Sequence, residues 1–212
     1  MNNATTRQKI IDTCREMNRL GVNQGKSGNV SMRIGDGFLI TPSGLGYDTM
    51  EPADIVEMDL DAGYQGKRTP SGEWRIHRDI LRAHSDVRVV IHAHAMFCTT
   101  LAIHGLSIPA VHYLVLLAGG DDIPCAPYAP PMTRALSDTV LSTLVGRRAC
   151  LMAHHGVITV GEDLEETLNL LVEVESLAAQ YWHALQIGPP PVLNEQQMRE
   201  AREIMKDYGR QK

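Results

Sequence analysis

The chain has 212 residues, and its 20 Lys and Arg against 25 Asp and Glu give a net charge of −5. Its longest apolar run is the six residues 113–118, far short of the roughly 20 that a membrane-spanning helix needs, and it has no basic block of the kind that binds nucleic acid. This excludes membrane and nucleic acid as main partners. The length fits a single domain over 1–212. Because the start MNNATTRQKI lacks a secretory apolar segment, we expect a cytoplasmic protein.

The first half of the chain alternates helices with short β-rich runs. Apolar residues at near-helical spacing predict a first helix that is capped by Thr5 or Thr6 and stops at Gly21. Turn residues then separate runs rich in β-branched side chains. The elements expected next are a hairpin of strands 30–34 and 38–41, a strand 55–60, a helix of about 73–84 capped by Ser71, a strand 88–94 and a helix 96–104.

The second half begins with a segment, 106–131, that Pro and Gly punctuate. A helix capped by Thr133 follows, and then two strands, 149–153 and 157–160, on either side of a His-His-Gly turn. The remaining expected elements are a long helix to about 187, opened by a capping box of Asp163 and Glu166, and a last helix from Asn194 and Gln197 to near Tyr208.

This alternation of helices with short strands favours a three-layer α/β/α domain. The hairpins imply that its central sheet is mixed and not purely parallel. The four cysteines are widely spaced and form no C-x-x-C motif, so they are expected to be reduced, buried thiols.

Histidines give the first chemical signal. His92 and His94 are separated by one residue on a predicted strand, so both side chains lie on one face of it. A second pair, His154 and His155, ends another apolar strand. One imidazole from each place could complete a three-histidine site with an open position, which suits a transition metal and zinc first. The spacing does not choose between His154 and His155, because neighbours on a strand point to opposite faces.

Three small-residue turns give the second signal. They cover 25–29, 41–44 and 71–72, and each could present backbone N–H groups and hydroxyls to a phosphate, although such a turn alone is most often a plain β-turn. The third turn directly precedes Glu73, a carboxylate that could stand beside the metal. His77, farther along the same predicted helix, is expected to be a packing residue.

These residues lie in segments that resemble the class II aldolase/adducin family, and within it the bacterial L-fuculose-1-phosphate aldolase group. The resemblance rests on the order and spacing of SGNVS, LITPSG, SGEWRIH, IHAHA, IPAVHY, AGGDDIPCAPYA, HHG and the final DYG. It implies a mixed, mostly antiparallel central sheet and a homotetramer whose active sites lie between subunits.

The resemblance also implies roles for individual residues. The zinc ligands would be His92, His94 and His155, with Glu73 as the acid/base beside the metal. Tyr113 would act at the aldehyde oxygen, and Tyr208 would reach a site at a subunit boundary. The phosphate pocket would consist of Gly28, Asn29, Ser43, Gly44, Ser71 and Gly72. Two positions depart from the group, which has T-P-T-G and S-S-E where this chain has Ser43 and Gly72.

The implied function is the zinc-dependent, reversible cleavage of a ketose 1-phosphate, of the L-fuculose 1-phosphate type, to dihydroxyacetone phosphate and a short aldehyde such as lactaldehyde. Aldolases for 5-deoxyribulose 1-phosphate or 5-methylthioribulose 1-phosphate are an alternative with the same catalytic residues. A sugar-phosphate 4-epimerase is another alternative. The epimerases of this family look as if they carry Asp after the third turn, so Glu73 favours an aldolase. A non-catalytic adducin-like binding module would have lost the histidines.

Overall fold

The computed structural model describes residues 3–206, which form six α-helices, three 3-10 turns and eight strands. The helices are α1 (Asn3–Arg19), α2 (Trp74–Ala83), α3 (Met96–Ile103), α4 (Arg134–Thr143), α5 (Leu164–Ile187) and α6 (Glu195–Met205). The 3-10 turns are η1 (Tyr47–Thr49), η2 (Pro52–Asp54) and η3 (Tyr113–Ala118). The strands are β1 (Asn29–Ile34), β2 (Gly37–Ile40), β3 (Val56–Asp59), β4 (Tyr64–Gln65), β5 (Val89–Ala93), β6 (Cys125–Ala126), β7 (Ala149–Met152) and β8 (Gly156–Gly161).

The strands form one sheet in the order β4-β3-β2-β1-β5-β8-β7-β6. Each neighbouring pair is antiparallel except β6 and β7, which are parallel. The expected mixed, mostly antiparallel sheet is therefore confirmed. Two edge strands, β4 and β6, and the 3-10 turn η3 were not predicted, since none is long enough to show a period in its side chains.

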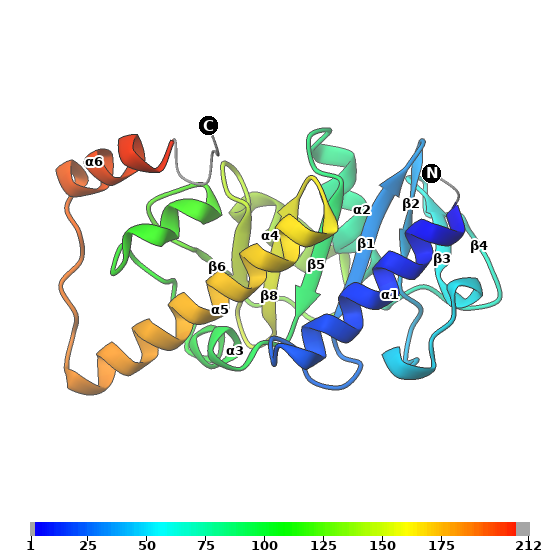
Figure 1. Ribbon diagram of the computed structural model, residues 1–212, viewed down its shortest axis with the longest axis horizontal. Helices are drawn as coiled ribbons and strands as arrows, with labels where there is room; N and C mark the ends of the chain where they lie inside the picture. Colours follow the sequence, from blue (N-terminus) through cyan, green and yellow to red (C-terminus); the bar gives the residue numbers. More distant parts are fainter. Residues whose placement is uncertain (1–2, 207–212) are drawn as a thin grey trace.

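Helices cover both faces of the sheet, as expected. On one face, sheet residues such as Val89 and Ile91 pack with the apolar sides of α1, α3 and α5. On the other face, Val90 packs with α2 and α4. Figure 1 shows α1 and the long α5 crossing in front of the sheet, with α2 and α4 behind it. The layers are therefore α/β/α, and β5, in the middle of the sheet, is buried over its whole length.

Several predicted boundaries shift. Helix α1 begins at Asn3, so Thr5 and Thr6 lie within it and are not its cap, but the predicted stop is correct because Gly21 follows the helix with φ 75°. Helix α2 begins at Trp74 with Glu73 as its N-cap. Ser71 is therefore not that cap, because the chain makes one more turn, in which the Ser71 hydroxyl accepts from the Glu73 N–H (3.3 Å).

Two of the helix caps predicted farther along the chain are confirmed, and a third is partly confirmed. Thr133 caps α4, and the capping box of Asn194 with Gln197 opens α6. At α5 the box is only half formed, since the Asp163 carboxylate accepts from the Glu166 N–H while the Glu166 carboxylate accepts from the N–H of Glu162. The predicted end of the last helix, near Tyr208, lies outside the described residues.

All four cysteines are free thiols, and three of them are buried. Within residues 3–206, no helix combines the length and the apolar character needed to cross a bilayer.

Candidate functional site

Three histidines converge at one end of the two central strands. His92 lies on β5, His94 directly follows that strand, and His155 lies in the turn between β7 and β8. Their ring centroids are 4.8 to 5.2 Å apart, and one nitrogen from each ring lies within 4.8 Å of the other two. Strand β5 ends at Ala93, one residue before the predicted end, yet His94 still joins His92. Three imidazole nitrogens at this spacing are a ligand set for a divalent metal.

The orientation of His92 supports metal binding. Its Nδ1 is 3.0 Å from the carbonyl oxygen of Val157, which can only accept, so Nδ1 carries the proton. Its Nε2 therefore has a free lone pair, and this atom is buried without a partner among the described residues. Buried polar atoms are normally paired, and ligating histidines commonly hold the other ring nitrogen in this way. The residues present thus fit a metal ion.

Burial keeps all three rings neutral, as ligation requires. It lowers the pKa of His92 well below its usual range, and the neighbouring histidines lower it further. Burial also lowers the pKa of His94, and burial with the nearby His94 lowers the pKa of His155 to about 4.

The tight turn between β7 and β8 selects His155 over His154. His154 adopts a left-handed backbone with φ 58°, and its ring contacts Tyr128 instead of the other histidines. Gly156 follows, packed so closely that a Cβ there would overlap the carbonyl oxygen of Ala93 and lie 3.1 Å from the His94 ring. A glycine is therefore required for the turn to approach β5.

Glu73 stands beside this cluster. Its Oε1 is 3.9 Å from His155 Nε2 and accepts a hydrogen bond from the Met132 N–H (3.2 Å). Its Oε2 is buried and has no partner within residues 3–206. Burial raises the pKa of Glu73, although the Met132 N–H partly opposes this. A carboxyl group with one oxygen held and the other free can exchange a proton with a bound molecule.

The three small-residue turns come together next to Glu73. They line a pocket of about 160 Å³, and all six residues expected to bind phosphate are part of its wall. The other lining residues are Lys26, Ser27, Pro42, Glu73 and Met132. The resemblance implied this shared pocket, whereas residue pattern alone does not bring the three turns together. The β1–β2 hairpin pairing and an isolated bridge between Pro42 and Pro70 place them together.

The side chain of Met132 lies against Gly72. A Cβ at Gly72 would overlap the Met132 sulfur and lie 2.9 Å from its Cγ. Met132 itself has a left-handed backbone, with φ 61°, which directs its N–H to Glu73. The thioether therefore occupies the space of a side chain at position 72. Sequence reasoning missed this residue, since a methionine carries no signal for such a conformation.

Two other residues that sequence reasoning did not single out, Asn23 and Glu175, accept hydrogen bonds from the backbone at or near the histidine cluster. The buried Asn23 accepts from the backbone N–H of His94 and from the hydroxyl of Ser27, both at 3.3 Å, and so connects the metal cluster with the pocket turn. The Glu175 carboxylate accepts from the N–H groups of Phe97 and Cys98, both at 2.8 Å. It thus caps α3, which starts two residues after His94.

The contacts described above do not involve Tyr113 or Tyr208, the two tyrosines expected to act in catalysis. Tyr113 begins η3, where it is 42% exposed and stacks against His112, and it does not line the pocket beside Glu73. Tyr208 lies outside the described residues. Their roles stay predictions.

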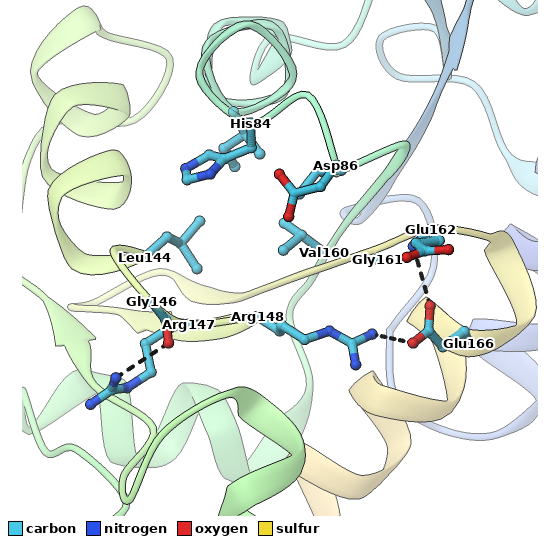
Figure 2. A pocket seen from close by; sticks show the side chains of 12 residues that line it. His84, Asp86, Leu144, Gly146, Arg147, Arg148, Val160, Gly161, Glu162 and Glu166 are labelled. Atoms are coloured by element: carbon cyan, nitrogen blue, oxygen red, sulfur yellow. Dashed lines mark hydrogen bonds and ion pairs between the residues drawn. The ribbon is translucent and has the colours of Figure 1, made fainter. Parts of the chain in front are cut away.

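A larger pocket, of about 360 Å³, lies away from these residues between α2, α4 and the ends of β7 and β8. Figure 2 shows one ion pair among its lining residues, between Arg148 and Glu166 at 2.6 Å. It contains none of the histidines or turns described above. The smaller pocket beside Glu73 is therefore the candidate functional site.

Known proteins resemble this chain closely. Residues 8–182 match the family model described as Class II Aldolase and Adducin N-terminal domain. A 5-methylthioribulose-1-phosphate/5-deoxyribulose-1-phosphate aldolase of Rhodospirillum rubrum is 48% identical, over 96% of this chain and 92% of that protein. An L-fuculose phosphate aldolase of Escherichia coli is 46% identical, over 95% and 94%.

A solved structure of an L-fuculose 1-phosphate aldolase superposes with a TM-score of 0.92 at 32% identity, covering 97% of each chain. Family, fold and the histidine cluster thus agree, and a sugar phosphate is the class of substrate that the family implies. The chain belongs to the class II aldolase/adducin family and is a metal-dependent aldolase, a carbon–carbon lyase.

Proposed function

We propose that this aldolase reversibly cleaves the bond between C3 and C4 of a ketose 1-phosphate, of the L-fuculose 1-phosphate type, to dihydroxyacetone phosphate and a short aldehyde such as lactaldehyde. The observation that carries the proposal is the position of Glu73, which lines the small-residue pocket and lies 3.9 Å from His155. A phosphate held in that pocket would bring the neighbouring carbons of the ketose between Glu73 and the three histidines.

We further propose that His92, His94 and His155 hold one zinc ion per chain, because three imidazoles with an open position suit zinc. When bound, the metal supplies Lewis-acid stabilisation of the negative charge that develops on the ketose oxygens as the bond breaks. The turns, with Gly28, Asn29, Ser43, Gly44, Ser71 and Gly72, hold the phosphate and orient the bond.

Glu73 would handle the proton at the substrate carbon. As the bond breaks, its electron pair stays with C3, the carbon that becomes part of dihydroxyacetone phosphate, and Glu73 delivers a proton there. The raised pKa of this carboxyl favours the protonated form that the step uses. The Met132 N–H fixes Oε1, so Oε2 is the oxygen that would exchange the proton.

The remaining expectations belong to the same proposal. Tyr113 would handle the proton that the C4 hydroxyl gives up as its oxygen becomes the aldehyde oxygen, and Tyr208 would act at a site near a subunit boundary. Both roles go with a homotetramer whose sites lie between neighbouring copies.

A second candidate concerns the substrate alone. The relative from Rhodospirillum rubrum, at 48% identity, is named for 5-methylthioribulose 1-phosphate and 5-deoxyribulose 1-phosphate. All these ketose phosphates share the half that becomes dihydroxyacetone phosphate, so the pocket and Glu73 serve each of them. They differ in the aldehyde half, which lies away from these residues.

A substrate comparison tests the proposal. The zinc-loaded enzyme is assayed for release of dihydroxyacetone phosphate from the 1-phosphates of fuculose, rhamnulose, ribulose, 5-deoxyribulose and methylthioribulose. The highest kcat/KM with fuculose 1-phosphate supports the proposal, and the highest value with either of the last two supports the second candidate. Conversion to a 4-epimer without release of product would show a sugar-phosphate epimerase instead.

A variant tests the role of Glu73. Glu73→Gln keeps the size of the side chain and an oxygen for the Met132 N–H, but it cannot exchange a proton. We expect it to bind zinc normally while cleavage falls about 10²- to 10⁴-fold. Exchange of the dihydroxyacetone phosphate proton with solvent should fall equally, and retained exchange would show that another group moves this proton.

A further inference from the structure

A buried histidine lies behind the proposed phosphate pocket. His77, on α2, has no exposed surface and is not part of the metal cluster. Its Nδ1 is 2.7 Å from the hydroxyl oxygen of Ser31, and its Nε2 makes a short hydrogen bond to Oδ1 of Asn29. Its position on the helix predicted only packing, yet both of its nitrogens bond to side chains of β1.

The direction of these hydrogen bonds follows from the donors present. Ser31 is fully buried, and within residues 3–206 its hydroxyl has no acceptor other than His77 Nδ1. A buried hydroxyl proton needs an acceptor, so Ser31 donates to Nδ1 and the single proton of the neutral ring is on Nε2. Burial lowers the pKa of His77 to about 3, which keeps the ring neutral at physiological pH.

This arrangement fixes the amide of Asn29. The Nε2–H of His77 donates to Oδ1, because an amide nitrogen could not accept it. The NH2 group of Asn29 is then the part that is left for the pocket, whose wall Asn29 helps to form. The described residues offer this NH2 no hydrogen-bond partner. An NH2 donor attracts a phosphate oxygen, whereas the amide oxygen in its place would repel it.

We propose that His77 is a positioning residue for phosphate binding, which orients the Asn29 amide through the relay from Ser31 to His77 to Asn29. The proposal rests on the function proposed above, in which this pocket holds the substrate phosphate. His77 does not touch the substrate, and its effect is transmitted through Asn29 alone.

The test combines His77→Phe, which keeps the ring shape without nitrogens, with Asn29→Ala and the double variant. The readouts are the KM for the ketose 1-phosphate, kcat, and the dissociation constant of inorganic phosphate measured by calorimetry. We expect His77→Phe to raise the KM and the phosphate dissociation constant about 10- to 100-fold, the range for a lost hydrogen bond to a charged group, with kcat changed less than threefold.

The Asn29→Ala background separates positioning from packing. If His77 acts through Asn29, adding His77→Phe to Asn29→Ala changes phosphate affinity less than twofold. His77→Gln serves as the matched control, since its amide can accept from Ser31 and donate to Asn29, and it should recover most of the affinity. A full effect of His77→Phe in the Asn29→Ala background, or no effect in the unchanged chain, would overturn the proposal.

A measurement on the unmodified chain keeps the test decisive if His77→Phe does not fold. Nitrogen chemical shifts of ¹⁵N-labelled histidine should show His77 protonated on Nε2 and unprotonated on Nδ1, and the opposite tautomer would overturn the proposal. Failure of the proposed function is a different result. It would appear as an unmodified enzyme that releases no dihydroxyacetone phosphate, while phosphate calorimetry and the tautomer still report on His77.

Discussion

Gly156 offers the sharpest mutational test of how the fold holds the histidine cluster. Neither Gly156 nor Gly72 has a positive φ, so alanine fits the backbone at both positions. At Gly156, however, the new methyl group would overlap the carbonyl oxygen of Ala93 and lie 3.1 and 3.3 Å from ring carbons of His94 and His92. Relaxed carbon contacts are about 3.5 to 4.0 Å, so the turn must move away from β5.

The size of the effect follows from what has to move. The overlapping carbonyl belongs to the central strand β5, which pairs with β8 over five residues and cannot shift alone. Overpacking of this kind costs about 1–3 kcal/mol. We expect Gly156→Ala to lower the free energy of unfolding by about 2–3 kcal/mol. A shift of about 0.5 Å also exceeds the roughly 0.2 Å tolerance of metal–ligand distances, so zinc affinity should fall at least tenfold.

Gly72→Ala is the matched control. Its methyl group also overlaps a neighbour, but that neighbour is the side chain of Met132, which is 56% exposed and can rotate away. We expect a stability change of less than about 1 kcal/mol and unchanged zinc affinity. Urea unfolding of the metal-free proteins and zinc titration with a competing chelator measure both quantities. Equal losses in the two variants would refute the argument that the backbone contact at Gly156 holds the cluster.

Two further predictions concern stability. Glu175→Gln should destabilise the protein by about 1–2 kcal/mol in urea unfolding, because one of the N–H groups of Phe97 and Cys98 loses its acceptor and the other keeps only an uncharged one. An unchanged midpoint would show that water caps α3 equally well. The pKa of His77 is about 3 in the folded chain and about 6.5 when unfolded, so the unfolded state takes up the proton first. Its contribution to stability is therefore lost as the pH falls below about 6.5, which amounts to about 2 kcal/mol by pH 5. His77→Gln should lack this part of the pH dependence, and identical loss between pH 7 and pH 5 in both chelator-treated proteins would contradict it.

The sequence predicted the parts of the site that local pattern controls. The His-x-His spacing on an apolar strand placed His92 and His94 on one side of β5, and this is confirmed. A second histidine pair at a strand end supplied the third member, but the choice of His155 needed either the resemblance or the backbone of the turn. The left-handed φ of His154 makes that choice, and no residue pattern encodes it.

The contacts that orient the site could not be predicted, because they join distant segments. The Met132 N–H reaches Glu73 across 59 residues, and the Glu175 carboxylate reaches Phe97 across 78. His77 was predicted to be a packing residue because it lies on the apolar face of its helix. Only the register of β1 under α2, which places Ser31 and Asn29 against the two ring nitrogens, distinguishes it from a core residue.

The most direct test of the account is the metal dependence of one reaction. Release of dihydroxyacetone phosphate from a ketose 1-phosphate is followed in the enzyme as prepared, after chelation, and after stepwise return of zinc. We predict that activity disappears on chelation and returns in proportion to bound zinc, reaching its maximum at one ion per chain, with no recovery in a His92→Ala variant. Full activity after complete metal removal, or no release from any ketose 1-phosphate at full zinc loading, would contradict the account.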